Sequence, residues 1–546
     1  MDRMEPKMQV PMTPVRILKR AVKLYPKKPA VIDGDVRLTY EEVQKRVNQV
    51  AHAIHDLNIS PGGRVAVLDY NTYRYMELYF GIAQSGRVML PLNTRLSQEE
   101  YIYILNDAEA EVVIFHADFK NVMKKIRKEI KTIKYAYIAE GFDAEDWISG
   151  TYEGLLEKSL SDPLPFDLKD ENQLVNLYYT SGTTGKPKGV MLTHRNVYIN
   201  ALSAVISFQL EDKTVWHHIA PLFHIADSFF IWSVTFQGGR HIMQRQFAPR
   251  SVLKTMEDEK VTSTMMVPTM VNFLLNLPDI ERFDLSSLQQ VMVGGAPMSP
   301  SNAKKMMEKL GCRYISGYGL TETCPLLAVG NLKDTLSDAP EEIKLGHLTR
   351  TGFEVVGVDL RVVDKNGRDV PWDGKTVGEI IVRGDNVMKG YWKLPNETAE
   401  SIRDGYFYTG DLAHVDPEGY LFIVDRAKDI IITCGENIAS VEIENVIYAH
   451  PEVLECAVIA VPDRVMGEVA KAMVVLKSGA SVSERELIVF CRKNLARFKV
   501  PRYVKFVSEL PKSGSGKILK QELRNIPTFS SNASTSSNCP ISFAEN

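Results

Sequence analysis

Residues 179–190, "YTSGTTGKPKGV", concentrate the residue types that bind phosphate. Glycines let backbone N–H groups turn toward an anion, and the hydroxyl and lysine side chains add donors and positive charge. The stretch departs from the common phosphate-binding loop, because Pro187 follows Gly185-Lys186 and Thr180 stands where the first glycine belongs. Taken alone, it is also compatible with a flexible Gly/Ser-rich surface turn.

Four later stretches carry further reactive or polar residues. The first of the four, "GYGLTE" (317–322), is not a Rossmann fingerprint, because Glu322 stands where a third glycine belongs. Each alone has a plain explanation, such as a β-turn, a helix cap, a solvated charge pair or an exposed lysine. Their combination and order are specific: "GYGLTE" (317–322), "YFYTGD" (406–411), "VDRAKD" (424–429) and "PKSGSGKI" (511–518).

Together with the first stretch, these motifs resemble those of the adenylate-forming superfamily of acyl-CoA synthetases, peptide-synthetase adenylation domains and firefly-type luciferases. The resemblance covers about residues 30 to 525. It implies an AMP-forming acid–thiol ligase, which joins a carboxylic acid to ATP, releases pyrophosphate and then transfers the acyl group to a thiol. The implied substrates are ATP, the acid and coenzyme A, with Mg²⁺ as cofactor; a homodimer is left open.

The resemblance assigns ATP contacts to several motifs. Gly294, Gly295 and Ala296 would pass along the adenine, and Tyr318 would stack on its face. Asp411 would accept hydrogen bonds from the ribose hydroxyls, helped by Arg426, because a carboxylate only accepts. The residues that would surround the β- and γ-phosphates are Thr180, Ser181, Gly182, Thr183, Thr184, Gly185 and Lys188.

The same resemblance assigns the catalytic groups. Thr321 would contact the α-phosphate, and Glu322 would hold Mg²⁺, which prefers carboxylate and phosphate oxygens. Lys517 would bridge the attacking carboxylate and the α-phosphate; its alternative is a solvated lysine. Because Lys517 lies far along the chain from the phosphate loop, the small domain is expected to close over the large one.

A second arrangement of the small domain is expected for thioester formation. Lys428 would be the hinge between the two arrangements, and Gly435 would come near coenzyme A in the rotated one. The sequence departs from some relatives here, because Ile432 stands six residues after the motif arginine, where luciferase-like members carry a lysine.

The expected acyl pocket contains His224, Asp227, Ser228, Val267 and Val293. His224 stands where amino-acid-activating members carry an aspartate, so an amino-acid substrate is disfavoured. We expect His224 to gate or position the acid rather than to be a plain core histidine. Asp227 either caps a helix or lines a polar pocket.

The overall pattern looks most like medium- to long-chain fatty acyl-CoA synthetases. Ser228, however, stands where some long-chain members place a tryptophan gate, so an aryl, short or branched acid stays open. A catalytically silent nucleotide-binding regulatory protein is the alternative from a different class. Such a protein is expected to lose Glu322, Asp411 or Lys517, and all three are present.

The elements that must position these residues follow from the apolar pattern. Short apolar runs alternate with helical periodicity, which predicts an α/β fold with layered, largely parallel sheets. The predicted strands are 64–70, 111–118, 174–180 and 288–295, with a helix over 195–206. After about residue 350 shorter strands predict a small β unit, and strands near 455–461, 469–476 and 502–508 with a helix near 482–496 predict a small α+β domain.

The changes in this pattern place boundaries near residues 424 and 428, and the resemblance implies an ATP- and acyl-binding domain over 1–424, a hinge at 425–428 and a mobile lid domain over 429–526. The Ser/Asn-rich residues 527–546 are predicted to be disordered. The total of 546 residues suits two or more domains.

Composition narrows the class of protein. The net charge of −3 does not indicate the excess of positive charge that is typical of proteins that bind nucleic acid. Six cysteines without C-x-x-C pairs favour a reduced, cytoplasmic setting over a disulfide scaffold or zinc site. The most apolar stretch, 215–239, contains three histidines and Asp227, so it predicts buried core rather than a stable membrane insertion.

Overall fold

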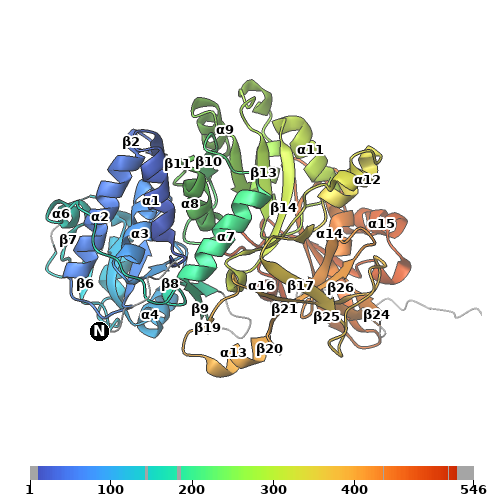
Figure 1. Cartoon of the computed structure of the whole chain (residues 1–546). Helices are drawn as coiled ribbons and strands as arrows, with labels where there is room; N and C mark the ends of the chain where they lie inside the picture. The colour runs from blue at the N-terminus through green and yellow to red at the C-terminus, as the bar shows by residue number, and fades with distance from the viewer. Residues whose placement is uncertain (1–9, 142–144, 181–185, 434–435, 515, 525–546) are drawn as a thin grey trace, which may run out of the picture. The chain divides into compact units, whose positions relative to one another are not determined.

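The computed structural model describes residues 10–141, 145–180, 186–433, 436–514 and 516–524. The chain divides into two compact units: Met1–Lys428 with Gly514–Lys517, and Asp429–Ser513 with Ile518–Asn546. Over the described residues, the larger unit contains sheets of eight, nine and five strands, and the smaller unit a sheet of five (Figure 1). The predicted functions of the domains and the hinge stay predictions.

The eight-stranded sheet carries the phosphate-loop stretch between two adjacent strands. Its strand order is β19-β9-β8-β4-β3-β5-β6-β7. The pairs from β4 to β7 are parallel, whereas β9 runs antiparallel to both β8 and β19. The strands are β3 (Arg64–Leu68), β4 (Val88–Pro91), β5 (Ala110–Phe115), β6 (Tyr135–Ile138), β7 (Gly150–Thr151), β8 (Leu174–Thr180), β9 (Lys188–Thr193) and β19 (Gly390–Tyr391).

The nine-stranded sheet has a parallel centre and antiparallel edges, in the order β16-β15-β14-β13-β12-β10-β11-β1-β2. The parallel pairs run from β14 to β1, and β15, β16 and β2 pair antiparallel. The strands are β1 (Pro29–Asp33), β2 (Val36–Thr39), β10 (Val215–His218), β11 (Arg240–Met243), β12 (Ser263–Met266), β13 (Gln290–Gly294), β14 (Arg313–Gly319), β15 (Leu326–Val329) and β16 (Phe353–Glu354).

Alternating side chains explain why these central strands are apolar throughout. In β3, Val65 and Val67 pack into the largest hydrophobic core, whereas Ala66 and Leu68 pack into a second core on the opposite face. Successive side chains of a strand point to opposite faces, so a strand covered on both sides needs apolar residues at every position. The helix-covered parallel sheets therefore follow directly from the short apolar runs.

Helices cover these sheets, and residues that favour helix ends stand where α7 begins and α8 ends. The side chain of Thr193 accepts from the Asn196 N–H at the start of α7, and α8 ends at Gly238, whose φ of +75° favours glycine. Helix α8 packs against α1 and α7 (Figure 1). The helices of the larger unit are α1 (Pro14–Leu24), α2 (Tyr40–Asp56), α3 (Tyr73–Gln84), α4 (Gln98–Asp107), α5 (Lys120–Ile126), α6 (Tyr152–Glu157), α7 (His194–Ser207), α8 (Ile225–Gln237), α9 (Pro249–Asp258), α10 (Pro268–Leu275), α11 (Pro300–Leu310), α12 (Glu341–Leu348) and α13 (Pro395–Ser401).

The five-stranded sheet of the larger unit is antiparallel and closes on a small core that includes Ile380 and Ala413. Its strands are β17 (Val358–Val363), β18 (Gly378–Gly384), β20 (Ile402–Arg403), β21 (Tyr406–Val415) and β22 (Leu421–Arg426).

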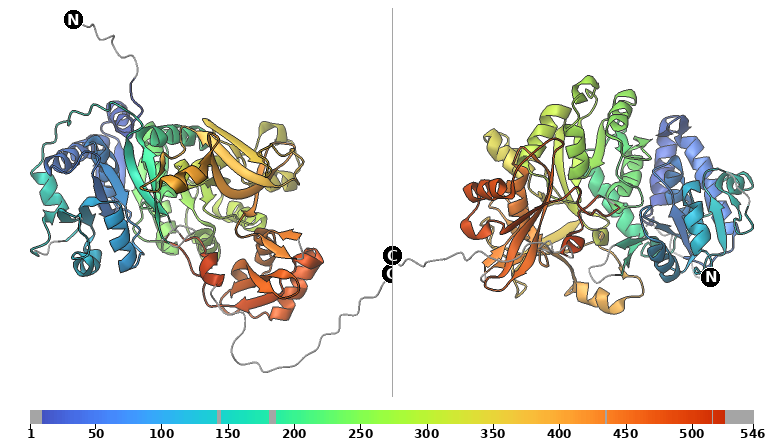
Figure 2. Two further views of the ribbon diagram at one scale, coloured as in Figure 1. Left: turned by 90° about the horizontal axis from the view of Figure 1, so that it is seen from below. Right: turned by 180° about the vertical axis from the view of Figure 1, so that it is seen from behind.

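The smaller unit, orange to red in Figure 2, packs helices on a five-stranded sheet with a core on each face. Cys456 and Val458 of β25 enter one core, and Ala457 and Ile459 enter the other. The elements are β23 (Ile431–Thr433), β24 (Glu436–Ile438), β25 (Val453–Asp463), β26 (Gly467–Leu476), β27 (Tyr503–Phe506), α14 (Ser440–Tyr448), α15 (Glu484–Asn494) and α16 (Lys520–Arg524).

The predicted α/β fold is confirmed. Every strand and helix predicted above is present, with boundaries shifted by a few residues. The apolar stretch 215–239 forms β10 and the buried helix α8. Over the described residues, no helix is both long and apolar enough to span a membrane. Whether the protein is cytoplasmic and whether it dimerises stay predictions.

Candidate active site

Several of the predicted site residues in the larger unit lie at or just beyond the carboxyl ends of parallel strands. Val267 follows β12, Gly295 and Ala296 follow β13, and His224 follows β10 after a short connection. Val293 and Gly294 end β13 itself. In open α/β sheets, ligands bind outside the carboxyl ends of the strands. We refer to this side of the nine-stranded sheet as the carboxyl edge.

Two glycines are required at the carboxyl edge for different reasons. Gly295 has a φ of +80°, which favours glycine. At Gly319 a Cβ atom would lie 1.8 Å from the carbonyl oxygen of Pro325, so any side chain would force the backbone apart. Gly295 therefore permits the left-handed backbone just after β13, and Gly319 permits the close approach of the end of β14 to the Pro325 backbone.

Tyr318, Asp411 and Arg426 meet in one cluster. Asp411 and Arg426 are cross-strand partners in β21 and β22, and the Arg426 Nε lies 3.1 Å from Asp411 Oδ1. The Tyr318 hydroxyl donates to Asp411 Oδ2 over 2.8 Å. Burial, with Asp411 beside it, raises the pKa of Tyr318 well above its ordinary value, so the hydroxyl stays protonated. The nearly buried carboxylate keeps lone pairs for further donors.

Thr321 and Glu322 lie on a short 3-10 helix, η3 (Thr321–Thr323), one residue after the end of β14 at Gly319. The Glu322 carbonyl accepts from the Met388 N–H over 2.8 Å, and its Oε1 accepts from the Tyr391 hydroxyl over 2.9 Å. Tyr391 belongs to none of the motifs recognised in the sequence. It lies 69 residues from Glu322, and no local pattern links the two.

His224 is the N-terminal cap of α8, and its Nδ1 accepts from the Ala226 N–H over 3.2 Å. Surrounding protein removes water from the ring and lowers the pKa of His224 to about 4. The ring is therefore neutral near pH 7, and Nε2 carries its proton. A neutral ring that can donate a hydrogen bond suits a positioning role.

Asp227 and Ser228 lie in the first turn of α8 and are fully buried in hydrogen-bonded networks. Asp227 Oδ1 accepts from the Trp216 indole N–H and lies 3.1 Å from His218 Nδ1. Its Oδ2 has no hydrogen-bond partner in the part of the chain that is described. Asp227 is not the N-cap, because His224 takes that position.

Ser228 belongs to a chain of hydroxyl groups under α8. Its Oγ lies 2.8 Å from the Tyr178 hydroxyl, which in turn lies 2.8 Å from the Tyr79 hydroxyl. Tyr79 donates to the Leu222 carbonyl. The side chain of Ser228 is therefore held in a fixed polar network, and Val267 and Val293 are buried residues of the largest hydrophobic core. Contact of any of these residues with an acid stays a prediction.

Of the remaining predicted residues, four lie on other segments of the larger unit, among them Lys517, whose positive charge acts together with burial to lower the pKa of His224; the others lie outside the described residues. Thr180 ends β8, and Lys188 begins β9 with its Nζ 5.2 Å from the centre of the Tyr391 ring. Lys428 is exposed at the end of the larger unit, and Lys517 belongs to that unit through the Gly514–Lys517 segment. Outside the described residues lie Ser181, Gly182, Thr183, Thr184, Gly185, Gly435 and the tail 527–546.

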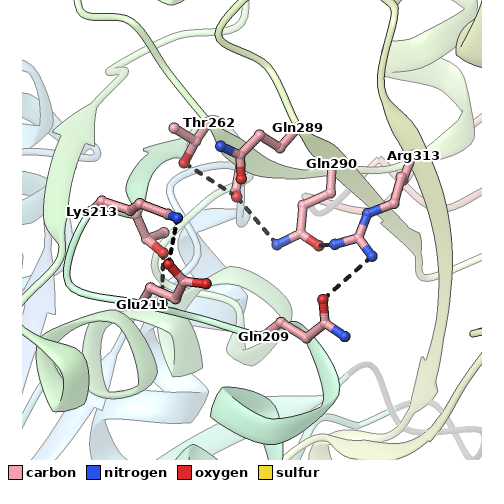
Figure 3. A pocket seen from close by; sticks show the side chains of 9 residues that line it. Gln209, Glu211, Lys213, Thr262, Gln289, Gln290 and Arg313 are labelled. Carbon is pink, nitrogen blue, oxygen red and sulfur yellow. Dashed lines mark hydrogen bonds and ion pairs between the residues drawn. The ribbon is translucent and has the colours of Figure 1, made fainter.

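A polar cavity of about 80 Å³ lies at the opposite, amino edge of the same sheet (Figure 3). Thr262, Gln290 and Arg313 stand at or just before the amino ends of β12, β13 and β14. The Gln290 side chain donates to the Phe208 carbonyl and accepts from Arg313. The polar groups of Gln290 are thus bonded within the protein, and none of the predicted site residues lines the cavity.

Comparison with known proteins defines the class. The AMP-binding enzyme family matches residues 18–392, and the AMP-binding enzyme C-terminal domain matches residues 442–517. The chain is 38% identical to feruloyl-CoA synthase of an Amycolatopsis species, covering 92% of this chain and 97% of that one. It is 36% identical to a peroxisomal butyrate–CoA ligase of Arabidopsis thaliana, covering 95% and 93%.

Solved structures agree with this result. A crystal structure of the anthranilate CoA ligase AuaEII with anthranoyl-AMP superimposes with a TM-score of 0.86 at 27% identity, covering 95% of this chain and 97% of that one. The chain therefore belongs to the AMP-binding enzymes of the adenylate-forming superfamily. Within that family it is an acid–thiol ligase of the ATP-dependent, AMP-forming acyl-CoA synthetase type, as the resemblance predicted.

Proposed function

We propose that this ligase activates a short-chain or aryl carboxylic acid at the carboxyl edge of the nine-stranded sheet. The acid would attack the α-phosphorus of ATP, forming acyl-AMP and releasing pyrophosphate. The thiol of coenzyme A would then attack the acyl carbon, forming the thioester and releasing AMP. The observation that carries this proposal is the meeting of Tyr318, Asp411 and Arg426 beside the Thr321–Glu322 turn.

Each residue has a proposed task that fits its chemistry. The Asp411 carboxylate would accept from the ribose hydroxyls while Arg426 and Tyr318 hold it in place. Gly294, Gly295 and Ala296 would leave room for the adenine. Thr321 would donate to the α-phosphate, and Lys517 would offset the charge that develops between the acid and that phosphate. His224, neutral at pH 7, would donate from Nε2 to position the acid.

The residues present fit a Mg²⁺ ion bound together with ATP. One Glu322 oxygen is engaged by Tyr391, and no hydrogen bond or ion pair to Oε2 is found among the residues described. Within the same residues, no group of three or more His, Cys, Asp or Glu side chains could hold a metal. This suits Mg²⁺, which commonly takes one or two carboxylates and completes its shell with phosphates and water. When bound, Mg²⁺ would neutralise charge on the phosphates.

The walls around α8 support an acid of limited length. The rings of Trp216 and Phe230 stack 3.6 Å apart, and Phe229 and Phe208 pack against Phe230. These rings are at most 1% exposed, and the buried hydroxyl of Ser228 in α8 is hydrogen-bonded to the Tyr178 hydroxyl. A close-packed interior has no room for a long acyl chain unless its side chains move. Three relatives are named for similarly short or aromatic acids, a butyrate, a feruloyl group and an anthranilate, whereas two others are named for fatty acids.

A medium- or long-chain fatty acid is the second candidate. It is favoured by the apolar composition of α8, "IADSFFIWSVTFQ", in which only Asp227, Ser228, Ser233, Thr235 and Gln237 are polar. Small movements of its aromatic side chains would be needed to admit such a chain.

A panel of acids tests both candidates. The protein is incubated with ATP, Mg²⁺ and butyrate, benzoate, ferulate, octanoate or palmitate, and pyrophosphate and thioester are measured with and without coenzyme A. We expect kcat/KM for the best short or aryl acid to exceed that for palmitate at least about tenfold. A preference for palmitate would replace the first candidate with the second. Acid-dependent pyrophosphate release without any thioester would indicate an adenylation-only enzyme.

A further inference from the structure

We propose that Tyr391 is a positioning residue that aims the Glu322 carboxylate at a divalent cation bound with ATP. It would also tie that carboxylate to β9, the strand that follows the phosphate-loop stretch. This inference rests on the proposed function, because it requires Glu322 to meet the cation.

The contact between the two side chains is direct. The Tyr391 hydroxyl donates to Glu322 Oε1 over 2.9 Å, and Tyr391 is only 8% exposed. A carboxylate held at one oxygen has its second oxygen fixed in direction, and here Oε2 is the one left for a cation. Hydrogen-bond partners of this kind orient metal ligands and strongly affect metal affinity.

Backbone contacts hold Tyr391 in place. It lies in β19 opposite Val190 of β9, and its N–H donates to Thr398 Oγ1 over 2.9 Å. The next residue, Trp392, donates its N–H to the Gly189 carbonyl over 2.7 Å. The backbone from which the Tyr391 ring projects is therefore anchored to β9.

The same short segment also contacts the backbone of Glu322. The Met388 N–H donates to the Glu322 carbonyl over 2.8 Å, so segment 388–392 binds β9 at one end and η3 at the other. A shift of β9 would therefore be transmitted to the carboxylate.

Lys188 adds a charged group to this arrangement. As the first residue of β9, it places its Nζ 5.2 Å from the centre of the Tyr391 ring, within the range of a cation–π contact. Lys188, Tyr391 and Glu322 thus form a row from the phosphate loop to the carboxylate. An anion that draws Lys188 toward it would act on the same ring that orients Glu322.

The test measures cation-dependent nucleotide binding rather than turnover. An ATP analogue with a methylene bridge between the α- and β-phosphorus atoms is titrated into the parent and Tyr391→Phe proteins by calorimetry at increasing Mg²⁺. We expect the Mg²⁺ concentration that gives half of the affinity gain to rise about 10-fold or more in Tyr391→Phe. Binding of the analogue without Mg²⁺ should stay within about twofold of the parent, because the phenyl ring remains.

The matched control is Tyr406→Phe. Its hydroxyl donates to the Asp359 carboxylate over 3.1 Å, and the Arg383 guanidinium lies over its ring at 4.9 Å. This variant should keep the parent's Mg²⁺ dependence. An unchanged Mg²⁺ midpoint in Tyr391→Phe would overturn the inference, and so would an equal loss of binding with and without Mg²⁺. A parent protein that binds no analogue would contradict the proposed function itself and the inference with it.

Discussion

The two edges of the nine-stranded sheet carry polar groups in different states. At the amino edge, Gln290 is 5% exposed, and its side chain forms hydrogen bonds with Phe208, Ser263 and Arg313. At the carboxyl edge, Glu322 has an oxygen with no partner among the described residues, and Asp411 retains accepting capacity beside Arg426. Both edges are polar, but they differ in what their groups are bonded to.

This difference separates a structural cavity from a binding site. A buried polar group without a partner costs free energy, so an enclosed cavity that serves only the fold is expected to satisfy its groups internally. Groups that await a ligand keep bonding capacity and lie where the strands end. The presence of a cavity at the amino edge is therefore a weaker sign of function than the Glu322 oxygen that has no partner among the described residues.

The largest expected effect comes from Lys517→Ala. If Lys517 offsets charge in the transition state at the carboxyl edge, its loss should lower the rate of acyl-adenylate formation by about 10²–10³. Single-turnover formation of acyl-AMP measures this step apart from thioester formation. Lys499→Ala serves as the control, because Lys499 pairs with Glu442 at a partly exposed site and such pairs contribute little. Adenylate formation at the parent's rate would show that Lys517 does not act in this step.

An intermediate effect is expected from Asp411→Asn. The amide keeps the shape but removes the charge, and hydrogen bonds to charged groups contribute about 1.5–3 kcal/mol, so the Kd for ATP should rise about 10- to 100-fold. Equilibrium binding of the methylene-bridged ATP analogue measures this change.

Asp359→Asn is a close chemical match for that experiment. Asp359 also pairs with an arginine and a tyrosine in the same small sheet, through Arg383 at 2.6 Å and Tyr406 at 3.1 Å. It should leave ATP binding unchanged. Equal losses in both variants would mean that Asp411 acts through the stability of the sheet and not through the ribose.

The sequence was enough to predict most of the larger elements and to single out several residues that lie at the carboxyl edge. Strand 174–180 was predicted at its observed bounds, because apolar and aromatic residues fill most of its positions and a Gly-rich sequence follows it. Strand β19 was not predicted, because two residues have no periodicity and their partner β9 lies far away in the chain. The Tyr391–Glu322 contact and the Trp216–Asp227 contact arise from tertiary packing and leave no local pattern.

The smallest expected effect on activity comes from the amino edge, through Gln290→Ala. This change leaves the Phe208 carbonyl and the Arg313 guanidinium without their buried partner, so the free energy of unfolding should fall by about 1–3 kcal/mol. The Kd for ATP should stay within about twofold of the parent, because no group at this edge is proposed to meet substrate. Urea unfolding and calorimetry measure the two quantities.

Lys213→Ala, at a 69% exposed side chain of the same cavity, should change stability by no more than about 0.5 kcal/mol. A tenfold loss of ATP binding in Gln290→Ala with unchanged stability would reverse the contrast between the two edges, since the satisfied cavity would then be the one that acts on the substrate.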